Sequence, residues 1–133
     1  MSLIFDTHAH YDDEAFDADR ETLLASMPEH GVGRILDPGC DPETSRRAVE
    51  LARTYPHVYA AVGWHPENCA PYTEDSLDAL RAWAREPKVV AIGEIGLDYY
   101  WEQNPPRELQ QRVLRDQLAL AQELDLPVIV HDR

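Results

Sequence analysis

Histidine and carboxylate side chains gather at the ends of the apolar segments of this sequence, where they could share a metal ion. Two of the histidines are two residues apart, and residues i and i+2 of a strand point to the same face. Imidazole and carboxylate ligands together suit Zn²⁺, Mn²⁺, Fe or Ni, whereas Ca²⁺ sites are built from oxygen ligands. The sequence therefore predicts a metal site formed by His8, His10, Glu94 and His131.

Each of these residues also has a purely structural interpretation. The first two histidines could be an ordinary surface pair, and His131 could be a rim histidine paired with Asp132. Glu94 could be a buried carboxylate paired with an arginine, but an ionised carboxylate in an apolar strand is costly without strong compensation, which a cation provides. Asp6 falls on the same alternating face as the histidine pair and could orient a metal ligand from behind.

Three further polar residues lie where apolar segments end. His65 precedes Pro66, which favours extended backbone at that point, and it could either contact substrate or form a hydrogen bond at the rim. Asp98 lies four residues after Glu94 on the same face, so it could reach the mouth of the site. For Asp37, a role in a loop or a cap is as good an interpretation as a role in the site.

The charge of the chain limits how it could meet nucleic acid. The formal net charge is −13, and non-specific affinity for nucleic acid comes from Lys and Arg at phosphates, so a protein that coats nucleic acid is excluded. An enzyme whose bound cations meet a phosphate locally is not excluded. The aromatic run at 99–101 could stack on bases, although packing against the next helix is the more common role of such a run.

Strands and helices alternate along the chain and would position these residues. Apolar runs predict strands over 3–10, 34–40, 58–65, 89–98 and 127–133, and amphipathic patterns predict helices over 16–30, 42–55, 76–84 and 104–124. Such alternation is typical of right-handed βαβ units and a parallel sheet, whose active sites lie at the C-terminal strand ends. The pattern fits either an open doubly wound sheet or five of the eight units of a barrel, which takes about 250 residues.

Composition agrees with one globular α/β domain over residues 1–133. The chain is 44% hydrophobic and 28% charged, without a run of the roughly 18 apolar residues that a membrane helix needs. No basic region followed by an apolar run marks a signal peptide, and we expect a cytoplasmic protein that does not engage a membrane. Its two cysteines, Cys40 and Cys69, do not make a disulfide framework and are expected to pack as small apolar residues.

Four motifs resemble those of one enzyme family. Phe5 to Asp12 resembles the Asp-Thr-His-x-His opening of the TatD-related hydrolases, and Val62 to Pro66 resembles their Gly-x-His-Pro segment. Ala91 to Tyr99 resembles their most distinctive motif, and 117–133 resembles the helix and strand that follow. The first motif also occurs across the wider amidohydrolase superfamily, whereas the four in this order are specific.

The resemblance implies a metal-dependent (β/α)₈ barrel of which this chain would supply the first five units. It implies two divalent ions, Mg²⁺, Mn²⁺ or Zn²⁺, with His8 and His10 on one ion, His131 on the other, and Glu94 bridging them as the catalytic carboxylate. His65 would then contact the substrate. The family includes Mg²⁺- or Mn²⁺-supported deoxyribonucleases, often 3′→5′ exonucleases, so DNA or another phosphodiester is the implied substrate.

The chain departs from the family pattern in one respect. The family has a further His on strand six and an Asp on strand eight in its metal centre, and neither position exists in residues 1–133. We therefore expect the N-terminal portion of a single barrel domain, inactive alone, or one that assembles with a second copy or a complementing C-terminal half. The alternatives are a hydrolase of amides, esters or lactones, and a non-catalytic half-barrel that serves as a structural or interaction module.

Overall fold

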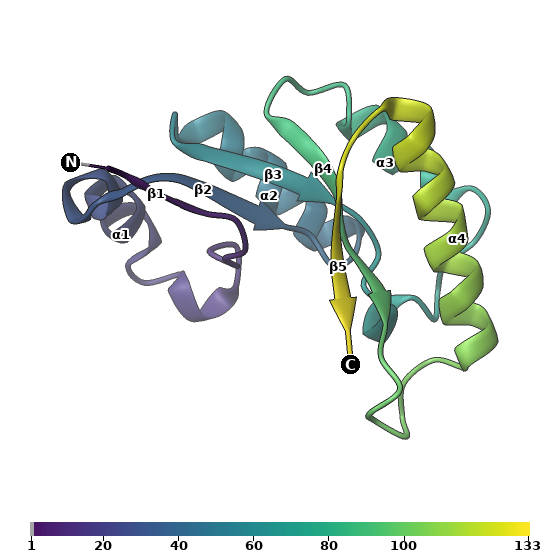
Figure 1. Ribbon diagram of the computed structural model, residues 1–133. Helices are drawn as coiled ribbons and strands as arrows, with labels where there is room; N and C mark the ends of the chain where they lie inside the picture. Colours follow the sequence, from purple (N-terminus) through teal and green to yellow (C-terminus); the bar gives the residue numbers. More distant parts are fainter. Residues whose placement is uncertain (1) are drawn as a thin grey trace.

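The computed structural model describes residues 2–133, which alternate between strands and helices around one parallel sheet (Figure 1). The strands are β1 (Ile4–Asp6), β2 (Val32–Pro38), β3 (Val58–Val62), β4 (Val89–Leu97) and β5 (Val128–Asp132). The helices are α1 (Arg20–Ser26), α2 (Pro42–Thr54), α3 (Ser76–Trp83) and α4 (Arg107–Leu124), with 3-10 turns η1 (Glu14–Phe16), η2 (Met27–His30) and η3 (Pro66–Asn68). Within the described residues, no helix combines the length and the apolarity that crossing a bilayer requires.

The order of the strands distinguishes a barrel segment from a doubly wound sheet. The five strands are parallel neighbours in the order β1-β2-β3-β4-β5. In a doubly wound sheet the order in which successive strands are added reverses at a switch point, whereas the strand order here does not reverse. The strand direction also turns steadily from β1 to β5, so that the sheet curls (Figure 1). Sequential order and curl together are those of part of a (β/α)₈ barrel.

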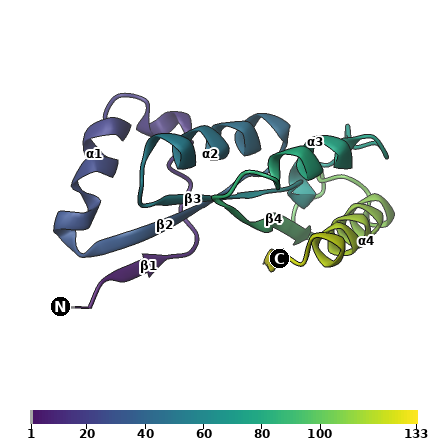
Figure 2. The ribbon, with the colours of Figure 1, turned by 90° about the horizontal axis from the view of Figure 1, so that it is seen from above.

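The helices cover one face of the curled sheet. Figure 2 shows α1, α2 and α3 along the same side of the strands, while α4 lies beside β4 and β5. The main core lies between these layers and its fully buried side chains include Leu24, Ile35, Val62, Leu80, Ile92 and Ile95. A smaller cluster of buried side chains, also from the central strands, consists of Leu36, Ala61 and Ala91.

The predicted start of the second helix at residue 42 is confirmed, and capping residues explain why α2 begins there. The side chain of Asp41 accepts a hydrogen bond from the Thr44 backbone N–H at 2.8 Å, and Thr44 Oγ1 accepts one from the Asp41 N–H at 3.0 Å. This reciprocal capping box satisfies two donors that a helix start leaves without partners. Pro42 occupies the first turn, where a missing N–H costs nothing.

Two predicted elements at the N-terminus are wrong in extent. The predicted strand 3–10 ends at Asp6, so the histidine pair lies in the segment that follows β1. The predicted helix 16–30 is broken into η1, a seven-residue α1 and η2. The physical reason for the second break is Pro28, which has no N–H to donate to the carbonyl of Leu24 and so cannot continue α1.

The buried face of α4 differs from the prediction. The apolar stripe of the predicted helix 104–124 includes Leu118, which is therefore expected to point inward. Leu118 is instead 42% exposed, whereas Gln110 and Gln117 are fully buried. Gln117 accepts a hydrogen bond from the Trp64 N–H at 2.7 Å and donates one to the Trp64 carbonyl at 3.1 Å. The two glutamines are therefore inside because they satisfy backbone groups that no strand or helix partner reaches.

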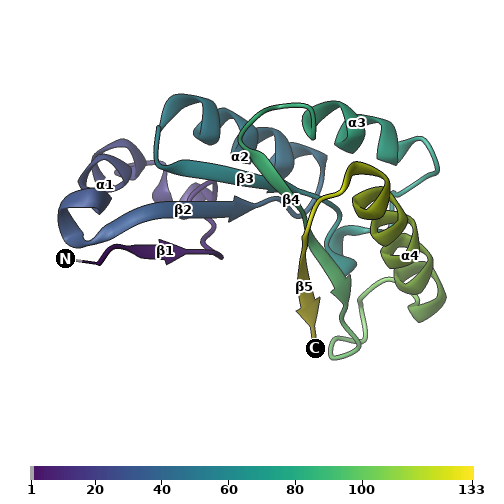
Figure 3. The ribbon, with the colours of Figure 1, turned by 45° about the horizontal axis from the view of Figure 1, so that its top comes forward.

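The outer strands β1 and β5 carry exposed apolar side chains. Ile4 of β1 is 62% exposed and Val130 of β5 is 57% exposed. Figure 3 shows these two strands at opposite ends of the curled sheet, with no further strand of the described residues beside either.

Candidate metal centre

The C-terminal ends of the strands bring the predicted site residues around a single carboxylate. Glu94 lies in the second half of β4, between β3 and β5. His8 and His10 follow β1, His65 follows β3, and His131 lies in β5. Four histidines that are far apart in the sequence therefore surround one glutamate, and they line an open pocket of about 360 Å³.

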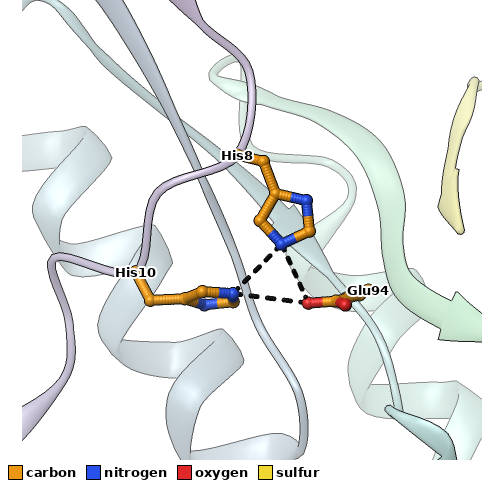
Figure 4. Close-up of side chains that lie close together, drawn as sticks. All are labelled: His8, His10 and Glu94. Carbon is orange, nitrogen blue, oxygen red and sulfur yellow. Dashed lines mark hydrogen bonds and ion pairs between the residues drawn. The ribbon is translucent and has the colours of Figure 1, made fainter. Parts of the chain in front are cut away.

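One carboxylate oxygen of Glu94 faces the histidine pair. Its Oε1 lies 3.1 Å from Nε2 of His8 and 3.3 Å from Nε2 of His10. The two Nε2 atoms are themselves 3.1 Å apart, so that three ligand-type atoms form a nearly equilateral triangle (Figure 4). Ligands bound at about 2.0–2.2 Å to one ion in tetrahedral or octahedral geometry are separated by similar distances.

The other carboxylate oxygen faces the remaining two histidines. Oε2 of Glu94 lies 3.2 Å from Nδ1 of His131 and 3.6 Å from Nε2 of His65. The two oxygens thus belong to two different groups of donor atoms, one on each side of the carboxylate. This division is the geometry that a bridging carboxylate requires.

The electrostatic surroundings of Glu94 exclude the simplest structural interpretation of this residue. Its side chain is 7% exposed, and within residues 2–133 its ion-pair partners are histidines rather than an arginine. Burial alone would raise the pKa of the Glu94 carboxyl, but hydrogen bonds from His10 and His65 lower it well below its usual range. The hydrogen bond to Glu94 likewise raises the pKa of His10. A negative charge is therefore held in the middle of the cluster.

The hydrogen-bond partners of His131 indicate which ring nitrogen carries the hydrogen. The other nitrogen then presents a lone pair to the cluster. Nε2 lies 2.8 Å from Oδ2 of Asp98, a carboxylate that only accepts, so we place the ring hydrogen on Nε2. Nδ1 is then an acceptor that lies 3.2 Å from the Glu94 oxygen, which is also an acceptor. Two acceptors this close need a proton or a cation between them, and the donor set of nitrogen and carboxylate atoms fits a divalent cation.

His65 has a different proton arrangement. Its Nδ1 accepts a hydrogen bond from the Glu67 backbone N–H at 3.1 Å, so the hydrogen of the neutral ring lies on Nε2. This Nε2–H points toward Glu94 and is a donor rather than a ligand atom. The geometry agrees with the sequence-based expectation of a substrate contact better than with a fifth ligand.

A glycine allows β5 to approach close enough to deliver His131. Gly96 has φ +149°, and a Cβ on it would lie 1.8 Å from the carbonyl oxygen of His131. Any side chain at this position would push β5 away from β4. The Gly-Glu-Ile-Gly segment therefore supplies both the carboxylate and the close strand contact.

Two carboxylates lie behind the cluster rather than in it. Asp98 was expected near the mouth of the site, but its side chain is fully buried and holds the outer nitrogen of His131. The expectation for its depth was wrong because the Tyr100 N–H, the Asn104 side chain and His131 enclose the carboxylate with hydrogen bonds. Asp6, expected to orient a metal ligand, accepts a hydrogen bond from the His8 backbone N–H at 3.2 Å.

A third carboxylate group lies beside His10 and was not expected. Asp37 is fully buried and Asp12 is 5% exposed, and each has one oxygen, Oδ1, without a hydrogen-bond partner. Burial, with the nearby charge of Asp12, raises the pKa of Asp37 to about 9. The signal in the sequence was the same as for Glu94, a carboxylate inside an apolar strand. Asp37 lies inside β2, and its Oδ2 accepts a hydrogen bond from the Asp12 backbone N–H at 3.0 Å, so it also has the role of holding a loop that the sequence left open.

The two cysteines are free thiols, one in the core and one in the wall of the pocket. Cys69 is fully buried, in agreement with its expected role as a small core residue. Cys40 is half-buried in the wall of the pocket, where burial, followed by the negative charge of Glu94, raises its pKa far above the usual range. Cys40 is therefore a neutral thiol in the wall of the pocket.

Comparison with known proteins agrees with the fold and with the motifs. The family model described as TatD related DNase matches residues 5–133. The crystal structure of YJJV, a TatD homologue from Escherichia coli K12, superposes with a TM-score of 0.89 at 42% identity, over 98% of this chain and 51% of that one. The part of the barrel expected from the sequence is thereby confirmed.

Two curated relatives match this chain over nearly its whole length but over only about half of their own. The uncharacterized metal-dependent hydrolase YabD of Bacillus subtilis is 43% identical over 98% of this chain and 51% of its own length. The 3′-5′ ssDNA/RNA exonuclease TatD of Salmonella typhimurium is 37% identical over 98% of this chain and 50% of its own. The chain thus spans about half the length of the curated relatives it matches. With a family model that covers nearly all of its residues, it belongs to the TatD-related DNase family.

Proposed function

We propose that the protein is a divalent-metal-dependent hydrolase that cleaves phosphodiester bonds in DNA, as a deoxyribonuclease of the 3′→5′ exonuclease type. The observation that carries this proposal is the buried Glu94 carboxylate, whose two oxygens face separate groups of histidine nitrogens at 3.1–3.6 Å. The relative named a 3′-5′ ssDNA/RNA exonuclease, at 37% identity, supports the choice of substrate.

The proposed metal ligands are those that the sequence predicted. His8, His10 and Oε1 of Glu94 would hold one ion, while His131 Nδ1 and Oε2 of Glu94 would hold a second. Because both groups include imidazole nitrogens and one shared carboxylate, Mn²⁺ or Zn²⁺ is the best match, with Mg²⁺ as an alternative. Ions in this arrangement supply Lewis-acid activation of a phosphate and of water.

The protein's own residues have distinct proposed roles. Glu94 keeps the two ligand groups at a fixed separation, and because hydrogen bonds from His10 and His65 hold its pKa well below the usual range, the carboxylate is ionised at neutral pH. His65 presents an Nε2–H toward the pocket, where it can donate a hydrogen bond to a phosphate oxygen. Asp98 holds the ring of His131 in the orientation that leaves Nδ1 free for the ion.

The acidic character of the chain fits a nuclease that meets its substrate locally. With a net charge of −13, the surface does not attract an extended duplex, so affinity must come from the site itself. The proposed divalent ions and a hydrogen bond from His65 would bind a single phosphate group in the pocket. A single-stranded end, which reaches into an open pocket, suits this arrangement better than a duplex.

The test is a cleavage assay on single-stranded DNA labelled at its 5′ end, with Mg²⁺ or Mn²⁺. We expect a ladder of products shortened from the 3′ end, and a loss of at least about 100-fold in rate for Glu94→Gln. Glu29→Gln, an exposed glutamate in η2, is the matched control and should cleave normally.

Other outcomes would identify a different function. Internal cuts without a 3′ preference would overturn the exonuclease assignment. Hydrolysis of simple esters, amides or lactones without any cleavage of DNA would indicate an amidohydrolase-type reaction at the same site. A folded protein that hydrolyses neither class with saturating Mn²⁺ would indicate a structural or interaction module.

A further inference from the structure

The loop after β4 presents two aromatic side chains that the packing of the fold does not use. Tyr100 is 60% exposed and Trp101 is 42% exposed, and their ring centroids are 4.5 Å apart at an interplanar angle of 84°. Tyr99, by contrast, accepts a hydrogen bond on its hydroxyl from Gln111 of α4 at 3.0 Å. Packing of this loop against the next helix therefore accounts for Tyr99 and leaves the other two rings outside the core.

An arginine side chain lies over the two exposed rings. The guanidinium carbon of Arg133 is 4.2 Å from the centroid of Tyr100 and 5.3 Å from that of Trp101. The guanidinium and the rings thus form one surface, the aromatic platform (Tyr100, Trp101 and Arg133). Planar guanidinium groups and aromatic rings are the two kinds of side chain on which nucleobases stack.

The charge of Arg133 is not neutralised by a neighbour. Arg46 and Arg81, by contrast, form ion pairs with carboxylates of their own surface. No carboxylate of residues 2–133 forms an ion pair with Arg133 within 4.0 Å. A cation that stays free in a chain of net charge −13 is available for an anionic ligand, such as a phosphate.

The platform is tied to the candidate metal centre through a shared residue. Asp98 Oδ1 accepts a hydrogen bond from the Tyr100 N–H at 3.1 Å, while Oδ2 faces His131 Nε2 at 2.8 Å. The Tyr99 N–H donates to the Arg133 carbonyl at 2.7 Å, which fixes the loop to β5. Figure 1 shows this loop between β4 and α4 beside the end of β5. Arg133 follows His131 by two residues, about 7 Å along the strand.

We propose that the aromatic platform stacks a nucleobase of a single-stranded nucleic acid whose neighbouring phosphate lies at the candidate metal centre. This rests on the proposed nuclease function and adds the subsite that binds the base. Tyr100 and Trp101 supply ring faces that accept any base, and Arg133 adds stacking together with a hydrogen-bond donor for a backbone phosphate. The platform binds single strands because the bases of a duplex are not free to stack on it.

The experiment compares binding of two dye-labelled single strands by fluorescence anisotropy in the presence of Mn²⁺. One is a phosphorothioate-linked oligothymidylate, which resists hydrolysis, and the other has the same backbone with base-free residues. We expect the protein to bind the oligothymidylate about tenfold more tightly than the base-free strand. Tyr100→Ala and Trp101→Ala should each remove most of this difference without changing the affinity for the base-free strand.

Two controls separate stacking from general effects. Trp101→Phe keeps an aromatic face and should retain most of the preference for bases. Leu118→Ala removes an apolar side chain that is equally exposed, at 42%, on α4, and should bind both strands as the unaltered protein does. Equal affinity of the unaltered protein for the two strands, or an unchanged preference in both alanine variants, would overturn the platform.

The same two oligonucleotides distinguish failure of the proposed stacking platform from failure of the proposed nuclease function. A preference for bases that depends on Tyr100 and Trp101, without cleavage of an unmodified oligothymidylate, would leave the platform standing and reject the nuclease. Cleavage by a protein that binds both strands equally would support the nuclease and reject the platform.

Discussion

His131 Nε2 lies 2.8 Å from Oδ2 of Asp98, a carboxylate whose side chain has no exposed surface. Burial opposes ionisation of Asp98, but the hydrogen bond from His131 and others from the loop lower its pKa overall, so it stays a carboxylate. The carboxylate therefore fixes both the ring orientation and the position of the ring hydrogen. Through this one contact, a residue outside the cluster decides which nitrogen of His131 faces Glu94.

Asp98→Asn should weaken metal binding by about 10- to 100-fold, because the amide can donate to Nε2 and so favour the tautomer with the hydrogen on Nδ1. Isothermal titration with Mn²⁺ measures the effect, and thermal unfolding verifies that the variant is folded. Asp132→Asn, an exposed neighbour on β5, is the matched control and should bind as the unaltered protein does. Equal affinity of both variants would show that Asp98 does not position a ligand.

Two substitutions distinguish a bridging glutamate from a ligand of one ion. Glu94→Gln should abolish binding at both positions, since each ligand group depends on one of its oxygens. His131→Ala should remove one ion and leave the position formed by His8 and His10. Metal content after dialysis, measured by atomic emission, gives the stoichiometry of each variant. Retention of the full metal content by Glu94→Gln would reject the bridging role.

The raised pKa of Asp37 predicts an unusual dependence of the free energy of unfolding on pH. Its pKa is about 9 in the folded chain, above the ordinary 3.8, so the stability that its protonated form contributes is complete below about pH 3.8 and is lost as the pH rises toward 9. Asp37→Asn stays neutral and can donate to Asp12, so it should raise the free energy of unfolding at pH 8 by about 1–2 kcal/mol.

Urea unfolding at pH 5 and pH 8, with metal removed, checks the prediction for Asp37. The gain in stability should be larger at pH 8 than at pH 5. The control is the exposed Asp13→Asn, in which the side-chain oxygen can still accept the Ala15 N–H that caps η1, so its effect on stability should be small at both pH values. A variant of Asp37 that is equally stabilised, or destabilised, at both pH values would contradict the assignment of a neutral carboxyl.

Gln117 should be essential for stability although its side chain does not line the pocket. Gln117→Leu leaves the N–H and the carbonyl of Trp64 buried without partners, which should lower the free energy of unfolding by about 2–4 kcal/mol. Gln122→Leu, at an exposed position of the same helix, should change it by less than about 0.5 kcal/mol. Chemical unfolding followed by circular dichroism measures both, and similar values for the two variants would contradict this role.

The sequence predicted the sheet and the cluster because both depend on patterns that local physics determines. Apolar runs separated by amphipathic segments predict βαβ units, and parallel strands gather their C-terminal ends at one edge, so Glu94 and the histidines could be expected to meet. That His8 and His10 lie beyond β1 did not matter, because the following segment still turns them toward β4.

Other features depend on contacts between distant segments and left no local signal. The buried position of Gln117 could not be predicted, because nothing near it in the sequence shows that the Trp64 backbone lacks other partners. Leu118 was expected inside for the same reason, and it is exposed because Gln117 takes the inward position. The pairing of Asp37 with Asp12 joins β2 to a loop 25 residues away, a contact that periodicity cannot reveal.

The most direct test of the metal centre is a crystal structure of the protein grown with Mn²⁺, with anomalous scattering recorded at the manganese edge. We predict one anomalous peak within bonding distance of His8, His10 and Oε1 of Glu94, and a second beside Oε2 and His131 Nδ1. Peaks located only at the carboxylates of Asp12 and Asp37, or no peak at Glu94 when the crystal contains bound manganese elsewhere, would contradict the account.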